Sequence, residues 1–403
     1  MKLIEPILQF HDELKQIRRT IHAHPELAYE ETQTSQLVAR QLEAWGIPVI
    51  RGLGGTGVVG VIRAGSSSRA VGLRADMDAL PLQEHNQFAH RSQHDGKMHA
   101  CGHDGHTAML LGAAHYLSQH RDFDGTVYVI FQPAEEGRGG AKAMMDDGLF
   151  EQCPMEAVFG MHNWPGMRAG TMGVVPGPMM ASSNEFELTI HGKGSHAAQP
   201  HRAVDPVMVA VQIAQSWQTI VSRNVSPLDS GVLSITQIHT GSATNIVPDS
   251  ASMIGTVRTF TLPVLDLIEQ RMRDIASHTA AAFGATVEFS FSRNYPPLIN
   301  HRSETEFALS VMADVVGREG ALSDIEPTMG SEDFAFMLQA KPGCYVFIGN
   351  GDGTHRDHGH GLGPCNLHNP SYDFNDDLLP IGASYWVQLA KRFLSESPAS
   401  QTN

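Results

Sequence analysis

Residues 70–131 decide the fold of this chain, because they place one long apolar helix between two strands of a buried type. The first strand reads Ala70-Val71-Gly72-Leu73-Arg74, and the second reads TVYVIF over residues 126–131. Between them, HTAMLLGAAHYLSQ over residues 106–119 has the length and composition of a helix. Unbroken apolar strands that alternate with helices predict an α/β domain, whose helices cover the faces of a mostly parallel sheet.

The same alternation extends to both sides of this stretch. We expect further strands at 57–63, 157–161 and 344–348, and further helices at 4–22, 31–45, 139–147 and 376–393. The tail after Ser395 is expected to be frayed.

The order of elements changes near Ser183. From there we expect a strand, a helix, two strands, a helix and a strand, at 185–191, 205–223, 231–239, 251–258, 262–283 and 286–291. This βαββαβ order is ferredoxin-like, and such a module can be inserted into a host domain. We therefore predict one discontinuous domain, 1–182 and 294–403, and an inserted domain, 183–293.

Composition excludes some classes of partner. The net charge is −15 over 403 residues, and no cluster of Lys and Arg is present, so nucleic acid is not expected to bind. The four cysteines show no paired short spacing, which favours a reducing compartment over a disulfide scaffold. No stretch resembles a signal peptide or a membrane span. We expect a soluble cytoplasmic protein that acts on small molecules.

Polar side chains follow the predicted strands. Asp76 and Asp78 follow one strand, Glu135 and Glu136 the next, and His162 a third. Ligands of open α/β sheets bind outside the carboxyl ends of the strands, so these five side chains should lie at one rim. Two carboxylates at i and i+2 could orient a ligating imidazole, but either Asp could equally cap a helix or form an Asx turn.

The segment from Cys101 to His106, CGHDGH, precedes the helix at 106–119. A thiol and imidazoles are ligands for a borderline-soft transition metal. The pair Glu135-Glu136 could then supply a ligand and a base, whereas alone it would be read as a solvated acidic turn. Because the chain has 22 histidines, chance clusters occur, and we expect His355, His358 and His360 to belong to a solvated or supporting loop.

Several motifs, in order, resemble those of the peptidase family M20 amidohydrolases, in the subgroup of hippurate hydrolase, other N-acyl-amino-acid amidohydrolases and plant auxin-conjugate hydrolases. The resemblance extends from the first helix to the last. The motifs are LRADMDALP at 73–81, HACGHDGH at 99–106, QPAEEG at 132–137, GMH at 160–162 and LHNP at 367–370.

This resemblance implies two divalent metal ions (Mn²⁺, Zn²⁺, Co²⁺ or Ni²⁺) with Cys101 as the bridge between them. The implied ligands are Cys101, His103, Glu136, His162 and His368. Glu135 would be the general base and then the acid. Asp78 would support the site, Asp76 replaces a ligating His of other branches, and Asp104 and His106 are expected at the helix start or in supporting contacts.

In the inserted domain, GKGSHAA at 192–198 resembles the lid motif of the family, in which His196 would stabilise the oxyanion, often from a partner subunit. Asn245 and Arg258 resemble residues that hold the amide and the α-carboxylate of the substrate. The implied activity is metal-dependent hydrolysis of N-acyl amino acids by a homodimer or a higher homo-oligomer that forms through the inserted domain. An M20 dipeptidase or a diaminopimelate-pathway deacylase is the alternative within the family.

Two other classes of protein compete with this hypothesis. Cys101 could attack directly in a Cys/His hydrolase, whose activity would not depend on metal. A non-catalytic metal-binding protein would keep Cys101 and the histidines but would have no use for Glu135 beside Glu136.

Overall fold

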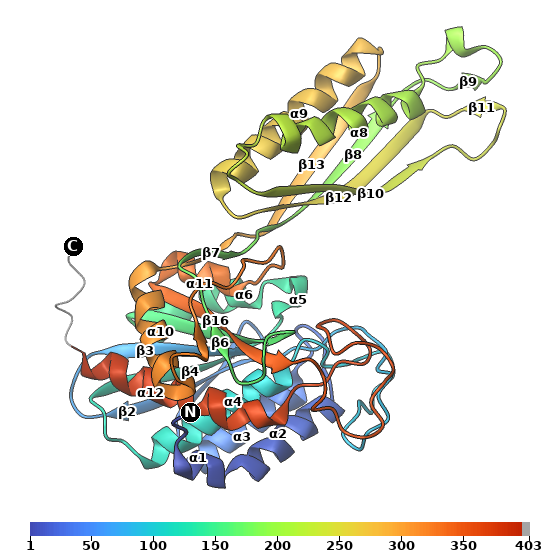
Figure 1. Ribbon diagram of the computed structural model, residues 1–403. Coiled ribbons are helices and arrows are strands. Elements are labelled where there is room, and N and C mark those ends of the chain that lie inside the picture. Colours follow the sequence, from blue (N-terminus) through green and yellow to red (C-terminus); the bar gives the residue numbers. More distant parts are fainter. Residues whose placement is uncertain (397–403) are drawn as a thin grey trace. The chain divides into compact units, whose positions relative to one another are not determined.

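The computed structural model describes residues 1–396 and divides the chain into two compact units. Within the described residues, unit 1 comprises 1–177, 299–326 and 336–396, and unit 2 comprises 178–298 and 327–335. Most of the tail predicted to be frayed lies outside the described residues. Figure 1 shows both units and their element labels.

Unit 1 is built on an eight-stranded mixed sheet in the order β1-β2-β4-β3-β5-β16-β6-β15. Its four central strands, β4, β3, β5 and β16, run parallel to one another, as the apolar runs predict. The strands are β1 Val49–Leu53, β2 Gly57–Ala64, β3 Ala70–Asp76, β4 Gly125–Gln132, β5 Ala157–Pro165, β6 Met172–Gly173, β15 Ala321–Leu322 and β16 Gly343–Gly351.

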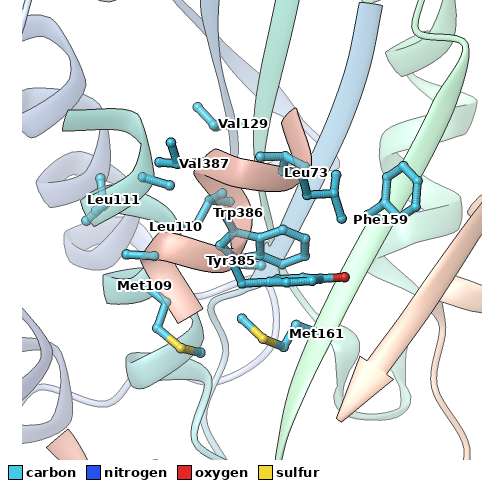
Figure 2. Close-up of a cluster of buried hydrophobic side chains, with 14 of the residues drawn as sticks. Leu73, Met109, Leu110, Leu111, Val129, Phe159, Met161, Tyr385, Trp386 and Val387 are labelled. Carbon is cyan, nitrogen blue, oxygen red and sulfur yellow. The ribbon is translucent and has the colours of Figure 1, made fainter. Parts of the chain in front are cut away.

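Helices of unit 1 pack on this sheet and on one another. The helix predicted between β3 and β4 is α4, which contacts α12 and α2. In Figure 2, apolar side chains of α4 and α12 meet those of β3, β4 and β5, and they form part of the buried core. The helices are α1 Glu5–Gln9, α2 His11–Ala23, α3 Thr32–Ala44, α4 His103–Gln119, α5 Glu135–Arg138, α6 Gly140–Asp146, α7 Leu149–Gln152, α10 Arg302–Val316 and α12 Leu379–Ser395. Helix α11, Phe334–Ala340, begins in unit 2 and continues into unit 1.

Unit 2 has the predicted βαββαβ order around a four-stranded antiparallel sheet, β10-β12-β8-β13. Its elements are β8 Ser183–His191, α8 Pro206–Arg223, β10 Gly231–Thr240, β12 Ser250–Thr259, α9 Leu262–Ala282 and β13 Thr286–Tyr295. A separate small ladder pairs β9, Ser195–His196, with β11, Ile246–Val247. The chain connections at the start and end of the module contain β7, Gly177–Met180, and β14, Leu298–Asn300.

Three details differ from the sequence expectation. The single N-terminal helix is two helices, α1 and α2, which meet at Phe10, whose ring stacks on His115 at 4.0 Å. Strand β1 and helices α5, α7, α10 and α11 were not predicted. Residues 327–335 join unit 2 rather than the first domain, because Thr328 and Gly330 share backbone hydrogen bonds with Met179 and Ala181.

Candidate metal centre

The side chains predicted for one rim gather at the carboxyl ends of the parallel strands of unit 1. Asp76 is the last residue of β3, Glu135 follows β4 by three residues, and His162 lies in the second half of β5. His103 is the first residue of α4, Cys101 precedes it by two residues, and His368 lies in the loop after β16. The topology therefore brings residues from five separate segments to one place.

Cys101 is shared by two groups of potential metal ligands. It lies with His103 and His162 in one group and with Glu136 and His368 in the other, the ligand atoms within each group being within 4.8 Å of one another. Its sulfur lies 3.3 Å from Nε2 of His162, and Nε2 of His368 lies 3.3 Å from Oε1 of Glu136. Two groups with one common sulfur fit two cations better than one.

One ring nitrogen of His103 supports this fit. Its Nε2 is buried, lies 3.7 Å from Oδ2 of Asp76 and has no hydrogen-bond partner among residues 1–396. A buried polar atom without a partner costs free energy, so such an atom among a thiol, imidazoles and carboxylates is the expected signature of a metal ligand. The residues present therefore fit divalent metal binding.

Asp78 links the two sequence motifs that supply these groups. Its Oδ1 accepts the backbone N–H of Glu135 at 3.0 Å and lies 3.3 Å from Nδ1 of His103. Its other oxygen accepts the backbone N–H of Glu136 at 2.9 Å. A carboxylate on Nδ1 leaves Nε2 of a histidine available as a ligand, so Asp78 orients His103 and the Glu135-Glu136 turn together.

Asp76 has a different set of contacts. Its carboxylate bonds Nδ1 of His106 at 2.6 Å and accepts from the Arg74 guanidinium at 2.7 Å. Asp76, His103 and His106 also form a potential metal group, but Asp76 is already paired with a buried cation. Burial alone would raise the pKa of Asp76, but His103 and Arg74 hold it well below its usual range.

Electrostatics separate the metal hypothesis from the Cys-nucleophile hypothesis. Burial, together with Glu136, Glu135 and Asp76, raises the pKa of Cys101 well above its usual range. A nucleophilic cysteine needs the opposite shift, which a cation at the sulfur would supply. Burial would lower the pKa of His103, but Asp76 and Asp78 outweigh it and raise this pKa to about 10. The same negative charge favours a bound divalent cation.

The backbone is strained at His368 and at Ala134, which precedes Glu135. Ala134 and His368 have φ of 55° and 58°, in the left-handed region that non-glycine residues rarely adopt. The N–H of Ala134 donates to Oε1 of buried Glu31 at 2.9 Å, and the N–H of His368 donates to the Ala100 carbonyl at 2.8 Å. Such strain persists where surrounding contacts impose it, and it is typical of functional sites.

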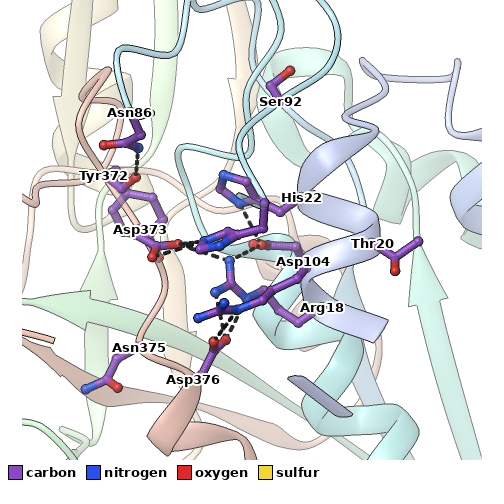
Figure 3. Close-up of polar contacts among 12 residues, drawn as sticks. Arg18, Thr20, His22, Asn86, Ser92, Asp104, Tyr372, Asp373, Asn375 and Asp376 are labelled. Carbon is purple, nitrogen blue, oxygen red and sulfur yellow. Dashed lines mark hydrogen bonds and ion pairs between the residues drawn. The ribbon is translucent and has the colours of Figure 1, made fainter. Parts of the chain in front are cut away.

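Asp104, the second residue of α4, belongs to a buried ionic network (Figure 3). Fully buried Arg18 of α2 lies 3.4 Å from Asp104, 3.0 Å from Asp373 and 2.7 Å from Asp376. Nδ1 of His22 lies 2.9 Å from the same oxygen of Asp104. This network ties α2 to the start of α4, which carries His103, and to the segment that follows His368.

The remaining predicted residues lie elsewhere. His196, Asn245 and Arg258 belong to unit 2, where the N–H of Ala197 donates to the Asn245 carbonyl at 3.0 Å and so places His196 beside Asn245. Arg258 lies on β12 and donates to Thr256 at 2.7 Å.

The histidine-rich loop at 355–360 contacts main-chain atoms. His355 lies 3.1 Å from the Asp373 carbonyl, and His360 lies 2.7 Å from that of Gly361. Neither these two histidines nor His358 belongs to a potential metal group within residues 1–396.

Sequence reasoning missed Glu31, Arg18, His22 and Tyr372. The only signal for Glu31, Arg18 and His22 was a charged or polar residue within a predicted helix, and such a residue more often lies on a solvated face.

Within residues 1–396, no helix has the length and apolar composition needed to cross a membrane.

Known proteins and structures resemble this chain over nearly its whole length. The family model for peptidase family M20/M25/M40 matches residues 72–392. A hippurate hydrolase of Campylobacter jejuni is 40% identical over 98% of this chain and 100% of its own length. The IAA-amino acid hydrolase ILR1-like 4 of Arabidopsis thaliana is 40% identical over 98% of this chain and 88% of its own.

A solved structure supports the same family as the two sequence relatives. The crystal structure of the Bacillus subtilis YXEP protein, described as a dinuclear metal binding peptidase from the M20 family, superposes with a TM-score of 0.82. Its sequence is 35% identical to this one, and the match covers 96% of this chain and 99% of the chain of that protein. The match extends from the strands that carry the rim to the closing helix, and this chain therefore belongs to peptidase family M20/M25/M40.

Proposed function

We propose that this protein is a metal-dependent amidohydrolase that cleaves the amide bond of N-acyl amino acids and releases a carboxylic acid and a free amino acid. One observation carries the proposal: the Cys101 sulfur is common to two groups of potential ligands, next to the buried carboxylate of Glu135. The relatives named hippurate hydrolase and IAA-amino acid hydrolase support the substrate class.

The proposed ligands of two divalent ions are Cys101, His103, Glu136, His162 and His368. When bound, such ions would polarise the amide carbonyl and lower the pKa of a water molecule. Mn²⁺, Zn²⁺, Co²⁺ and Ni²⁺ all suit a mixed set of sulfur, nitrogen and oxygen ligands. The proposed base is Glu135, whose carboxylate would take the proton of that water and later give it to the leaving amine nitrogen.

Residues of unit 2 would bind the substrate. Nδ1 of His196 accepts the N–H of Ala198 at 3.1 Å, so the proton of the neutral ring is on Nε2. That N–H can donate to a carbonyl oxygen as negative charge develops on it. Asn245 would hold the amide, and the planar Arg258 guanidinium suits the α-carboxylate of an amino acid.

Glu135→Gln tests the assignment of the base. We expect the variant to retain its metal content and lose turnover of hippurate, because the amide cannot accept the proton. The exposed Glu151→Gln is the matched control and should behave as the wild type. A Glu135→Gln protein with a tenth of the wild-type kcat would overturn the role of Glu135.

A substrate panel tests the reaction class. Hippurate, N-acetyl amino acids, dipeptides and N-succinyl-diaminopimelate would be assayed with each of the four metals. N-acyl amino acids with a free α-carboxylate should give the highest kcat/KM. A preference for dipeptides or for the diaminopimelate derivative would replace the proposed activity by the corresponding M20 activity.

We also propose that unit 2 mediates a homodimer and that the protein acts in the cytoplasm. Strand β10 is an edge of its sheet, and half-exposed Ile238 lies on it, which supports pairing with a second copy. Four buried free cysteines support a reducing compartment. Light scattering after size-exclusion chromatography should give twice the chain mass, and a monomer mass would contradict the dimer.

A further inference from the structure

Asn163 follows the proposed ligand His162 in β5, and no role in the reaction has been given to it. The residue is fully buried, and its backbone and side-chain polar groups all form hydrogen bonds. A buried amide with this many partners fixes the relative positions of the groups that it contacts.

Two of those contacts reach proposed metal ligands. The Asn163 carbonyl accepts from Nδ1 of His162 at 2.6 Å, which leaves Nε2 of His162 facing the Cys101 sulfur at 3.3 Å. The side-chain Nδ2 of Asn163 donates to the Cys101 carbonyl at 2.6 Å. A single residue thus holds the ring of one ligand and the backbone of another.

The backbone N–H of Asn163 also determines the tautomer of His106. It donates to Nε2 of His106 at 2.9 Å, so that nitrogen carries no proton. The proton is therefore on Nδ1, which donates to Asp76 at 2.6 Å. Both ring nitrogens of His106 are occupied, and His106 supports Asn163 instead of binding metal.

Tyr372 completes the contacts from the opposite side. Its hydroxyl donates to Oδ1 of Asn163 at 2.8 Å. If the amide were flipped, Oδ1 would face the Cys101 carbonyl, which is also an acceptor, so the bond that Nδ2 donates there would be lost. The orientation of the amide is therefore defined by its partners and not by space alone.

We infer that Asn163, held by His106 and Tyr372, is a positioning residue that presents Cys101 and His162 to a divalent cation in a fixed geometry. The inference rests on the proposed metal-dependent function. Residues that orient metal ligands typically contribute about 10–100-fold to metal affinity or activity.

The test is a Co²⁺ titration of the metal-free protein. Affinity would be measured by competition with a chelating dye, and sulfur-to-cobalt charge-transfer absorption would report on Cys101 directly. The variants are Asn163→Ala and Tyr372→Phe. Asn300→Ala is the matched control, because Asn300 is also buried and also bonds main-chain atoms, those of Tyr345 and Val175.

We expect Asn163→Ala to bind Co²⁺ about 10–100-fold more weakly, with a shifted charge-transfer band. Tyr372→Phe should show a smaller change in the same direction, and Asn300→Ala should keep the wild-type affinity and band despite a lower unfolding midpoint. Should Asn163→Ala fail to fold, Tyr372→Phe decides. A folded Asn163→Ala or Tyr372→Phe protein with the wild-type affinity and band would overturn the inference. A wild-type protein that binds no Co²⁺ would overturn the proposed function, and the inference with it.

Discussion

Replacing Gly102 by alanine tests how closely the backbone between Cys101 and His103 is packed. Gly102 has φ of 89°, and a Cβ at this position would overlap the Asn163 side-chain amide and the Tyr372 hydroxyl. Both neighbours are fully buried and hydrogen-bonded to each other, so neither can move without breaking that bond.

The expected cost has two parts. A left-handed backbone costs an alanine about 1–2 kcal/mol, and overpacking a dense site costs about 1–3 kcal/mol more. The free energy of unfolding should therefore fall by about 2–5 kcal/mol. Gly46→Ala is the matched control, because Gly46 has φ of 70° and no atom within 4 Å of its added Cβ, so that variant should lose only the backbone part.

The assay is urea unfolding of the chelated proteins followed by circular dichroism, so that metal binding does not contribute to the measured stability. Equal losses for Gly102→Ala and Gly46→Ala would refute the close packing of Asn163 and Tyr372 against the metal-binding segment.

Two further predictions concern the buried ionic network around Arg18 and Asp104. Arg18→Leu should destabilise the protein by about 3–5 kcal/mol, because it leaves buried carboxylates unpaired, whereas Arg51→Leu in an exposed pair with Glu43 should cost at most about 1 kcal/mol. The urea unfolding midpoints of the two variants would be compared, and equal losses of stability would contradict a stabilising role for the buried network. His22→Gln should change the pH dependence of stability. Burial would lower the pKa of His22, but Asp104 and Glu84 raise it to about 10. The contribution of His22 is therefore complete below about pH 6.5, its unfolded pKa, and is lost as the pH rises to about 10. The stability difference between wild type and His22→Gln should shrink over this window, and a difference that is constant with pH would exclude a protonated His22.

The arrangement of the core sheet and its rim could be predicted from the sequence. The strands are short, apolar and buried on both faces, so their positions followed from composition alone, and the general rule for strand ends placed Asp76, Glu135 and His162 together. Ligand roles came from the resemblance to the M20 family rather than from spacing.

The supporting contacts of Arg18 and Glu31 could not be predicted, because they join residues far apart in the chain. Arg18 is 355 positions from Asp373, and Ala134 is 103 positions from Glu31. No local pattern distinguishes such a buried charge from one on a solvated helix face. Similarly, the Phe10 ring at the break between α1 and α2 stacks on His115, a contact that no local pattern indicates.

The most direct test of the central claim is the activity of metal-depleted protein as divalent metal is restored. We predict that the chelated protein does not hydrolyse hippurate and that activity returns with Mn²⁺ or Co²⁺ until two ions are bound per chain. Cys101→Ala should fail to reach this stoichiometry, because its sulfur is common to both ligand groups. Full hydrolysis by protein shown to be free of metal, or two ions bound at wild-type affinity by Cys101→Ala, would contradict a two-metal centre in which Cys101 is a ligand.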